Sequence, residues 1–313
     1  ITGDRCVCLH CSSGRNADIA MNITSIQHVH PAWRAALWMA GALLSFSAMA
    51  VGGRELAAEL STFQILFFRS LIGLPLVGLV VMRYGGPQQL RTRRLPLHLL
   101  RNLAHFGGQY GWFYGLAFIS LAEVFAIEFT VPLWTALLAV VVLGERLTPI
   151  RLLAVILGIA GTFIILRPGS GMIHPAALAV LLAAFGYATA HTLTRKLVST
   201  ETPLAILFYM TLIQLPLGLI PALTDWTLPS PARWPWVIVV GVSALTAHYC
   251  MARALRLADA TVVVPLDFLR LPLIALIGAL FYGETVTWSL ALGSILILSG
   301  IATNLWGEQR RQE

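Results

Sequence analysis

Charged residues are scarce in this sequence. Asp, Glu, Lys and Arg make up 11% of its 313 residues, whereas soluble domains average about 25%. Hydrophobic residues make up 58%, and the mean hydropathy is +0.79. A soluble chain of this length could not bury so much apolar surface. The composition therefore excludes a soluble globular protein and predicts one that lies in a lipid bilayer.

Several motifs of enzymes and molecular motors are absent. The sequence has no GxxxxGK[ST] phosphate-binding loop, which excludes a built-in ATP-driven motor. It also has no HExxH, no GxSxG and no pair of CxxC motifs, so we expect no enzyme, no cofactor and no metal centre. A membrane-embedded enzyme that uses His105, His248 and Glu128 as acid–base groups is the weaker alternative.

Cysteine is rare, and three of the four cysteines lie within the first 11 residues. Cys6, Cys8 and Cys11, together with His10, could bind zinc or an iron–sulfur cluster, but they lack the paired spacing of a strong metal site. The segment also lacks the apolar centre of a signal peptide. We therefore expect residues 1–20 to lie upstream of the true start at Met21 and to bind no metal.

Long apolar runs dominate the rest of the chain. A membrane-spanning helix needs about 20 mostly apolar residues, and ten such runs follow one another, several of them separated by proline-containing breaks. The sequence therefore predicts an all-α membrane protein with ten transmembrane helices. The ten runs are 33–52, 63–82, 97–119, 121–143, 150–166, 175–194, 204–223, 234–255, 260–282 and 287–306.

A twelve-residue stretch occurs twice. Residues 65–76 read ILFFRSLIGLPL and residues 206–217 read ILFYMTLIQLPL, with eight identical positions at an offset of 141. At an offset of 139, Gly144-Glu145 falls on Gly283-Glu284. These matches predict a duplicated unit of about 140 residues. Because each unit holds five predicted spans, an odd number, the two copies should have opposite orientations in the membrane.

Lysine and arginine in the loops predict the orientation. If the N-terminus is inside, only Arg54, Arg167 and Arg233 fall outside, and we expect both termini to be cytoplasmic. The basic residues lie in short loops rather than on one face, which argues against nucleic acid as a partner. The thirteen on the inner side are Arg34, Arg83, Arg91, Arg93, Arg94, Arg146, Arg151, Arg195, Lys196, Arg253, Arg256, Arg310 and Arg311.

The sequence predicts two inverted sets of five helices, and the fourth and ninth helices contain proline and end on Gly-Glu. This pattern resembles that of the drug/metabolite transporter superfamily, EamA type. The segments concerned run from Pro132 to Glu145 and from Pro265 to Glu284. The segments HLLR (98–101), WFYGL (112–116) and FTVPL (129–133) are similar to the branch that includes S-adenosylmethionine uptake carriers. The resemblance implies a central cavity lined by helices 1–4 and 6–9. The expected organisation is an N-terminal tail (1–32), a first EamA repeat (33–166), a second EamA repeat (175–306) and a cytoplasmic tail (307–313).

Ionisable side chains inside the predicted spans are functional candidates, because they are expensive to bury in a membrane. Arg69 and Glu128 lie at similar depths and are expected to pair across the cavity, while Asp267 and Arg270 share one helix face. We expect the arginines to bind a substrate carboxylate or phosphate, and the carboxylates to take up a proton or a substrate cation. The alternative is a set of ion pairs that holds the helices in register. The candidates are Arg69, Arg101, His105, Glu128, Asp267 and Arg270. Of these, Arg101 lies near enough to the inner loop for its side chain to snorkel towards the membrane surface.

Aromatic and polar residues complete the predicted substrate site. Their rings could hold a planar or cationic substrate, although tyrosine and tryptophan also mark membrane interfaces. Glu145 and Glu284 end their helices at opposite faces, and we expect them to make gating contacts or to maintain the fold. The further site candidates lie on three predicted helices. His105, Gln109 and Trp112 share one face of the third helix, and Tyr110 lies beside them on the same helix. Tyr187 and His191 lie on the sixth helix, and His248 and Tyr249 lie on the eighth.

These features together predict a secondary carrier in the bacterial inner membrane that works by alternating access. The expected substrate is a small polar metabolite, namely an amino acid or a derivative, S-adenosylmethionine included. Protons as the coupling ion, the lipid bilayer and a second copy in a homodimer are the other expected partners. A carrier or exporter of riboflavin, of another organic anion or of a drug is the alternative, and a passive channel is less favoured.

Overall fold

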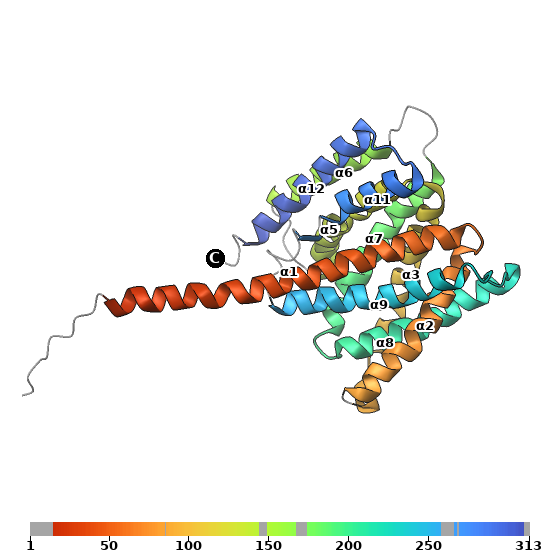
Figure 1. The fold of residues 1–313 in the computed structure, drawn as a ribbon, viewed down its shortest axis with the longest axis horizontal. Coiled ribbons are helices and arrows are strands. Elements are labelled where there is room, and N and C mark those ends of the chain that lie inside the picture. The colour runs from red at the N-terminus through yellow and green to blue at the C-terminus, as the bar shows by residue number, and fades with distance from the viewer. Residues whose placement is uncertain are drawn as a thin grey trace, which may run out of the picture.

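The computed structural model describes residues 15–84, 86–143, 149–166, 174–257, 266–267 and 269–309. Within this part of the chain every regular element is a helix (Figure 1), in agreement with the predicted all-α class. Two short 3-10 helices, η1 (Pro87–Leu90) and η2 (Leu223–Asp225), follow α2 and α8. The α-helices are α1 (Arg15–Ala57), α2 (Thr62–Arg83), α3 (Leu95–Phe118), α4 (Leu121–Glu128), α5 (Val131–Leu143), α6 (Pro149–Leu166), α7 (Pro175–Leu197), α8 (Pro203–Ala222), α9 (Trp234–Leu257), α11 (Arg270–Tyr282) and α12 (Trp288–Gln309).

Polar caps fix where several helices begin. Ser61 and Gln64 form a capping box at the start of α2, and Ser120 and Glu123 form one at the start of α4. In each box the serine hydroxyl accepts from one backbone N–H while the longer side chain accepts from another. Two backbone donors that no helical carbonyl reaches are thereby satisfied. The hydroxyl of Thr202 does the same for one donor of α8.

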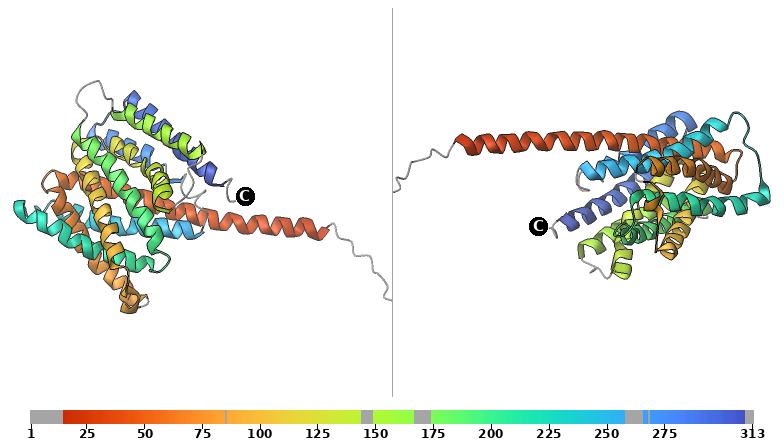
Figure 2. Two further views of the ribbon diagram at one scale, coloured as in Figure 1. Left: turned by 180° about the vertical axis from the view of Figure 1, so that it is seen from behind. Right: turned by 90° about the horizontal axis from the view of Figure 1, so that it is seen from below.

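Helices far apart in the sequence pack side by side. The segment α1 lies along α9 and α3 lies along α7, while α2 crosses α8 and α4 contacts α11. The helices α6 and α12 form a pair at one side of the bundle, and the N-terminal part of α1 extends beyond it (Figure 2). Glycine permits the α3–α7 approach, because a Cβ at Gly111 would overlap the backbone of Ala179.

The predicted fourth span, 121–143, is not one continuous helix. It is interrupted at Phe129 and Thr130, so that α4 ends at Glu128 and α5 begins at Val131. Pro132 has no N–H to continue the hydrogen-bond ladder of α4. The hydroxyl and the N–H of Thr130 both bond to the carbonyl of Ile127, at 2.7 and 3.0 Å, which satisfies the interrupted backbone inside the bundle.

Six of the described helical segments are long and apolar enough to cross a membrane: Trp33–Ala57, Thr62–Arg83, Leu121–Val142, Pro175–Leu197, Pro203–Asp225 and Trp234–Met251. Shorter apolar helices cover Leu152–Leu166, Arg270–Tyr282 and Trp288–Thr303. The helix α3 is absent from both groups because its buried polar side chains lower its hydropathy. The first part of the predicted ninth span, 260–265, lies outside the described residues.

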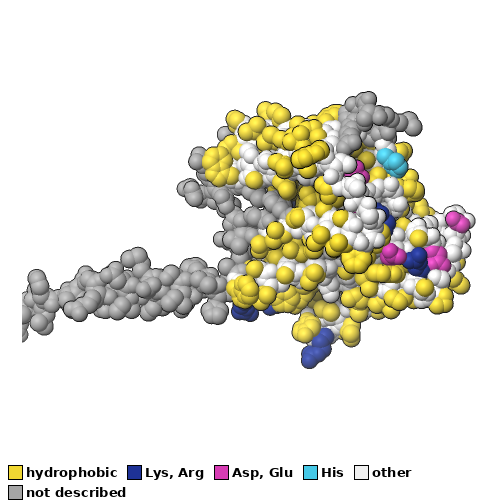
Figure 3. Space-filling view, turned by 45° about the horizontal axis from the view of Figure 1, so that its top comes forward, with side chains coloured by type: hydrophobic (Ala, Val, Ile, Leu, Met, Phe, Trp, Pro, Cys, Tyr) yellow, Lys and Arg dark blue, Asp and Glu magenta, His cyan; other side chains and the backbone are white. Residues whose placement is uncertain are grey.

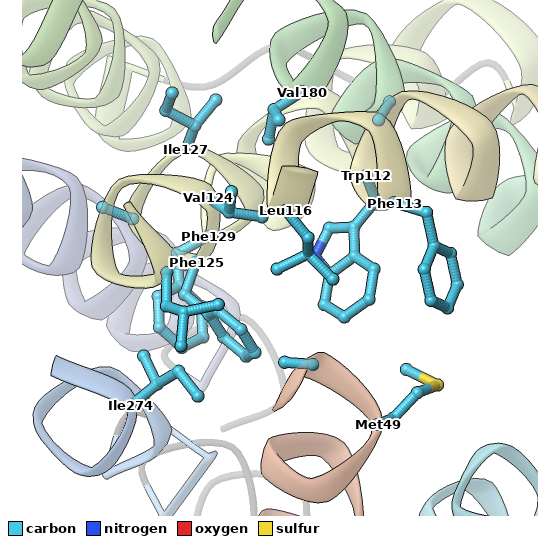
Figure 4. Close-up of a cluster of buried hydrophobic side chains, with 14 of the residues drawn as sticks. Met49, Trp112, Phe113, Leu116, Val124, Phe125, Ile127, Phe129, Val180 and Ile274 are labelled. Atoms are coloured by element: carbon cyan, nitrogen blue, oxygen red, sulfur yellow. The ribbon is translucent and has the colours of Figure 1, made fainter. Parts of the chain in front are cut away.

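The surface and the interior fit a lipid environment. Hydrophobic side chains cover most of the face drawn in Figure 3, and the few charged ones lie towards its edges. Phe281 and Trp288, for example, are 77% and 91% exposed, as suits side chains that face lipid rather than water. In the interior, Phe125 and Phe129 point from α4 and its end towards Ile274 of α11 (Figure 4). This aromatic packing forms one wall of the polar site described next.

Candidate functional site

Polar side chains, several of them fully buried, gather in two clusters within the described bundle. We call the first the paired cluster, and it consists of Trp112, Glu128, Asp267 and Arg270. We call the second the arginine–histidine cluster, and it consists of Arg69, Arg101, His105, His191, Gln214 and His248. Tyr187 on α7 lies between them, since it is close enough to Arg69, Glu128 and Arg270 to interact electrostatically with all three.

In the paired cluster, Arg270 holds two carboxylates. Its Nη2 lies 3.4 Å from Oε1 of Glu128 and 3.3 Å from Oδ2 of Asp267. Trp112 adds a 2.7 Å hydrogen bond from Nε1 to Oε2 of Glu128. The side chains of Asp267 and Arg270 do meet, although Asp267 precedes α11, which begins at Arg270. Because Glu128 comes from one predicted repeat and Arg270 from the other, this cluster ties the two together.

Aromatic rings surround the guanidinium of Arg270. Its Cζ lies 4.7 Å from the ring centroid of Phe46, 5.1 Å from that of Phe125 and 5.2 Å from that of Phe129. Rings at this distance attract a cation through their negative faces. The interruption after Glu128 contributes to this arrangement, because it brings Phe129 to the guanidinium together with the carboxylate. Arg270 is thus fixed by charge and by packing at once.

The arginine–histidine cluster is built on the crossing of α2 with α8. Nη1 of Arg69 donates to Oε1 of Gln214 over 3.4 Å, and Nε2 of Gln214 lies 3.0 Å from Nδ1 of His105. Arginine can only donate, so the oxygen of Gln214 must face Arg69 and its amide nitrogen must face His105. Nδ1 of His105 is then the acceptor. The ring is therefore neutral and carries its proton on Nε2.

Arg101 on α3 also has only neutral hydrogen-bond partners among the described residues. Its Nε donates to Oγ1 of Thr194 over 3.2 Å, and its Nη1 donates to Oδ1 of Asn102 over 2.7 Å. The side chain is 6% exposed, so the predicted snorkelling towards the loop is wrong. The hydroxyl of Thr194 and the amide of Asn102 hold the guanidinium inside the bundle. On α3, Arg101 lies one helical turn before His105, which Gln214 links to Arg69.

The predicted pairing of Arg69 with Glu128 is also wrong. Glu128 bonds to Arg270 and Trp112, while Arg69 bonds to Gln214. Equal depth along two helices does not decide which side chains meet, since each helix can turn a residue towards a different neighbour. Here Arg69 lies at the α2–α8 crossing, and Glu128 lies where α4 meets α11.

The remaining candidates divide by location. Tyr249 is 53% exposed and makes an edge contact with Trp38, so it does not lie in either cluster. Tyr110 stacks between Phe63 and Tyr114 at centroid distances of 4.6 and 6.2 Å. Gln109 is buried, and its Oε1 has no described partner. Nδ1 of His248 donates to the carbonyl of Ala244. The side chain of His191 is exposed on the surface of the described residues, and it interacts electrostatically with Arg101.

Glu284 joins three segments at one end of the bundle. Its Oε1 lies 3.1 Å from Nη1 of Arg54, and its Oε2 accepts the first N–H of α4, that of Leu121, over 2.8 Å. Arg54 lies in the last turn of α1, and the contact fits both roles expected for Glu284, gating and fold maintenance. Arg54 also donates to the carbonyl of Ile119. Glu145 lies outside the described residues.

Further bonds close both ends of the bundle. At the end that holds Glu284, Nη1 of Arg233 lies 2.7 Å from Oε2 of Glu55, and the hydroxyl of Tyr282 donates to Oε1 of the same carboxylate over 2.9 Å. At the other end, the hydroxyl of Thr92 donates to Glu201 over 2.7 Å, and that of Tyr209 donates to the carbonyl of Leu90. These bonds lie on either side of the two clusters, in which His191, Glu128 and Asp267 remain accessible.

Gln214, Asn102 and Thr194 are the site residues that sequence reasoning missed. Gln214 left a signal, because it falls at the position of Gly73 when the two twelve-residue stretches are aligned. A polar residue that one copy has and the other lacks is a candidate for function at a repeat interface. Asn102 and Thr194 left a weaker signal, since uncharged polar residues are common in helices.

An apolar cavity of about 210 Å³ lies away from both clusters, between α5, α6 and α7. Leu133, Val155 and Leu181 are among its lining residues. We assign the functional site to the polar clusters nevertheless, because a polar solute needs their charges. Within the described residues no group of three or more His, Cys, Asp or Glu side chains could hold a metal. The cysteines at positions 6, 8 and 11 and His10 lie outside those residues.

Apolar spans around buried charged side chains are typical of membrane proteins that move a solute or an ion. The model of the EamA-like transporter family matches residues 33–167 and again residues 174–306. The chain therefore belongs to the EamA-like transporter family and is an integral membrane protein.

Relatives of known name include transporters of different solutes. The S-adenosylmethionine uptake transporter of Rickettsia prowazekii is 28% identical over 277 residues, covering 87% of this chain and 92% of that protein. The riboflavin transporter of Rhizobium johnstonii is 32% identical over 287 residues, covering 88% and 92%. The riboflavin transporter of Vibrio cholerae is 30% identical, covering 89% and 94%. A solved structure described only as a crystal structure of a protein has a TM-score of 0.63 at 19% identity, covers 89% of this chain and 99% of its own, and supports the fold alone.

Proposed function

We propose that this chain is a secondary carrier of a small polar metabolite, an amino acid or a derivative such as S-adenosylmethionine, in the bacterial inner membrane. The observation that carries this proposal is the pair of charged clusters inside the bundle, to which both predicted repeats contribute. Buried charge in a membrane protein is expensive and marks a solute or ion pathway. The names of the relatives support a transported solute of this size.

The packing of the helices supports two inverted halves, residues 33–166 and 175–306, that move against each other. The first helix of each half lies along the third helix of the other, since α1 packs on α9 and α7 packs on α3. The helices α2 and α8, α4 and α11, and α6 and α12 pair with their own counterparts. This is the pattern that a two-fold axis in the membrane plane would produce.

Alternating access would then exchange two sets of contacts. The bonds of Glu284 with Arg54 and of Arg233 with Glu55 close one end, and those of Glu201 and Tyr209 close the other. Opening towards either side requires one set to part while the other holds. The loop arginines favour an inner location for the Glu201 end and for both termini.

Proton coupling would use the paired cluster. Glu128 and Asp267 share one arginine and remain partly accessible, at 17% and 19% exposure. The two carboxylates exceed the single arginine by one negative charge, so a proton or a substrate cation completes the balance. This supports a proton as the coupling ion.

A flavin carrier is the second candidate. The relatives named riboflavin transporters reach 32% identity, and the ring stack of Phe63, Tyr110 and Tyr114 resembles a surface on which a planar ring could lie. This stack is separate from the two charged clusters.

Counterflow in proteoliposomes tests the carrier proposal. Vesicles with purified protein are preloaded with an unlabelled compound and offered the labelled form of S-adenosylmethionine, of each of several amino acids, or of riboflavin, with and without a proton gradient. Saturable uptake that is accelerated by the internal compound is the expected result. Uptake that neither saturates nor responds to the internal compound would indicate a channel and contradict the proposal.

A further inference from the structure

Two buried arginines lack an acidic partner among the described residues. Arg69 and Arg101 are 4% and 6% exposed, and each bonds only to neutral side chains. The carboxylates whose ion pairs the structure describes are engaged elsewhere, namely Glu55, Glu59, Glu128, Glu201, Asp267 and Glu284. Arginine stays protonated in proteins, so this cluster holds two positive charges that nothing described here balances.

The surroundings of these arginines do not reduce the charge. His105 is neutral because Gln214 donates to its Nδ1, and Gln214 itself is uncharged. Removing an ion from water carries a penalty of several kcal/mol that only a counter-charge with good hydrogen bonds offsets. Arg69 and Arg101 moreover repel each other. An anion between them would relieve both effects.

Unused hydrogen-bond donors accompany the unbalanced charge. Nε of Arg69 is buried and has no acceptor in the structure. The geometry of Gln214 leaves the Nε2 proton of His105 as a second donor. A planar arginine fork with a free N–H matches the two oxygens of a carboxylate. The arginine–histidine cluster thus offers positive charge and oriented N–H donors to one anionic group.

We propose that Arg69 and Arg101 form the subsite for the carboxylate of the transported metabolite. This inference rests on the proposed carrier function and narrows its substrate class to metabolites that carry a carboxylate. Riboflavin has neither a carboxylate nor a phosphate and would leave both arginines unbalanced. The charge of the site therefore favours an amino acid or its derivative over a flavin.

Buried hydrogen-bond acceptors without a donor lie further along α3 and in the paired cluster. Oε1 of Gln109 is buried without a donor, and so is Oδ1 of Asp267 in the paired cluster. Gln109 follows Arg101 by eight residues on α3, or about 12 Å along the helix axis. A substrate whose carboxylate meets the arginines could bring a cation or an N–H to these acceptors at its other end. The site thus fits an α-amino acid with a long side chain that ends in a cationic or donor group.

A matched pair of solutes tests the subsite without any variant. S-adenosylmethionine and its decarboxylated form share the sulfonium and the nucleoside and differ in the carboxylate. In counterflow with the wild-type protein, we expect the carboxylate form to be preferred by on the order of 10- to 100-fold in transport efficiency, as expected for lost charge-assisted hydrogen bonds. Equal transport of the two forms would overturn the proposal.

Variants then assign the preference to the two arginines. Arg69→Gln and Arg101→Gln should lower transport of S-adenosylmethionine by on the order of 10- to 100-fold and leave the decarboxylated form unchanged, which removes the preference. Arg69→Lys, which keeps the charge, should retain part of it. Arg83→Gln, at an exposed arginine, is the matched control and should change neither solute. Equal losses for both solutes in Arg69→Gln would overturn the proposal.

Two further outcomes separate this inference from the carrier function. Saturable counterflow of riboflavin that persists in Arg69→Gln and Arg101→Gln would refute the carboxylate subsite and leave the carrier standing. No counterflow of any compound by folded wild-type protein would refute the carrier function itself. If replacing chloride by a larger inert anion slowed both solutes equally, chloride rather than the substrate would occupy the arginines, and the proposal would be wrong.

Discussion

The two buried clusters treat charge in opposite ways. In the paired cluster, one arginine meets two carboxylates and three aromatic rings, and an indole N–H donates to one of those carboxylates. In the arginine–histidine cluster, the two arginines donate only to amide and hydroxyl oxygens. Both contain ionisable groups at similar burial. Charge balance, rather than burial, therefore distinguishes a group that holds the structure together from one that awaits a ligand.

The largest loss of stability is expected in the paired cluster, where the buried charges have partners of opposite sign. Arg270→Ala would leave Glu128 and Asp267 buried and facing each other without a cation. Removing one partner of a buried ion pair destabilises a protein by about 3–5 kcal/mol, and transport should be lost as well. Thermal unfolding of the purified variant in detergent measures the first effect, with Arg83→Ala as the control. An unchanged unfolding midpoint would show that Arg270 does not hold the helices in register.

In the arginine–histidine cluster, removing an arginine should leave the stability unchanged or raise it. Arg69→Met removes a buried charge that has no counter-charge and leaves a side chain of similar length. We expect the unfolding midpoint to stay the same or to rise, since replacing buried ions by packed apolar groups is often neutral or stabilising, while transport of a carboxylate substrate falls to background. A midpoint that drops as far as that of Arg270→Ala would erase the distinction between the clusters.

A smaller loss is expected from Trp112→Phe. Phenylalanine keeps the ring contact with Phe125, whose centroid is 5.7 Å away, but it cannot donate to Glu128. A hydrogen bond to a charged group contributes about 1.5–3 kcal/mol. Stability should therefore decrease by less than in Arg270→Ala, as measured by the same unfolding experiment. Restoration of wild-type stability by adding Glu128→Gln would identify the lone carboxylate as the cause, whereas further loss would point to packing.

A balanced pair near the surface should matter less for stability. Glu284→Gln removes the ion pair with Arg54, whose side chains are 14% and 20% exposed, and keeps an oxygen for the N–H of Leu121. We expect a loss of about 1 kcal/mol or less. Labelling of a cysteine placed beside Arg54 should nevertheless become faster, because one tie at this end is gone. Unaltered labelling would argue for fold maintenance as the only role of Glu284.

The smallest effect is expected outside both clusters. Tyr249→Ala removes an exposed side chain that contacts Trp38 on the outer surface of the bundle. Transport and its substrate preference should remain at the wild-type level in the counterflow assay. A tenfold loss of transport would place Tyr249 in the substrate path after all.

The class of fold follows from composition and periodicity, because apolar runs and a duplicated stretch depend only on local sequence. The same holds for contacts between residues that are close in the sequence, such as Asp267 with Arg270. The partner of Arg69 does not follow, since it depends on how α2 and α8 rotate about their own axes. Tyr249 shows the same limit, because one residue beyond His248 is a turn of about 100° and faces the other side.

The interruption of the fourth span was also hidden. Pro132 alone allows either a kink or a break, and the choice depends on how the neighbouring backbone groups find partners. At the break, the hydroxyl and the N–H of Thr130 both bond to the carbonyl of Ile127. That bond becomes visible only when the backbone is known.

The amide of Gln214 has a consequence for the evolution of solute choice. It accepts from Arg69 through one oxygen, and glutamate has the same shape with a second oxygen in place of the nitrogen. A single-base change in the codon would thus place a resident carboxylate against Arg69, while His105 would move its proton to Nδ1. The pocket would then carry its own counter-anion and favour neutral or cationic solutes. One atom in one side chain is enough to divide descendants of this carrier into lineages with different cargo.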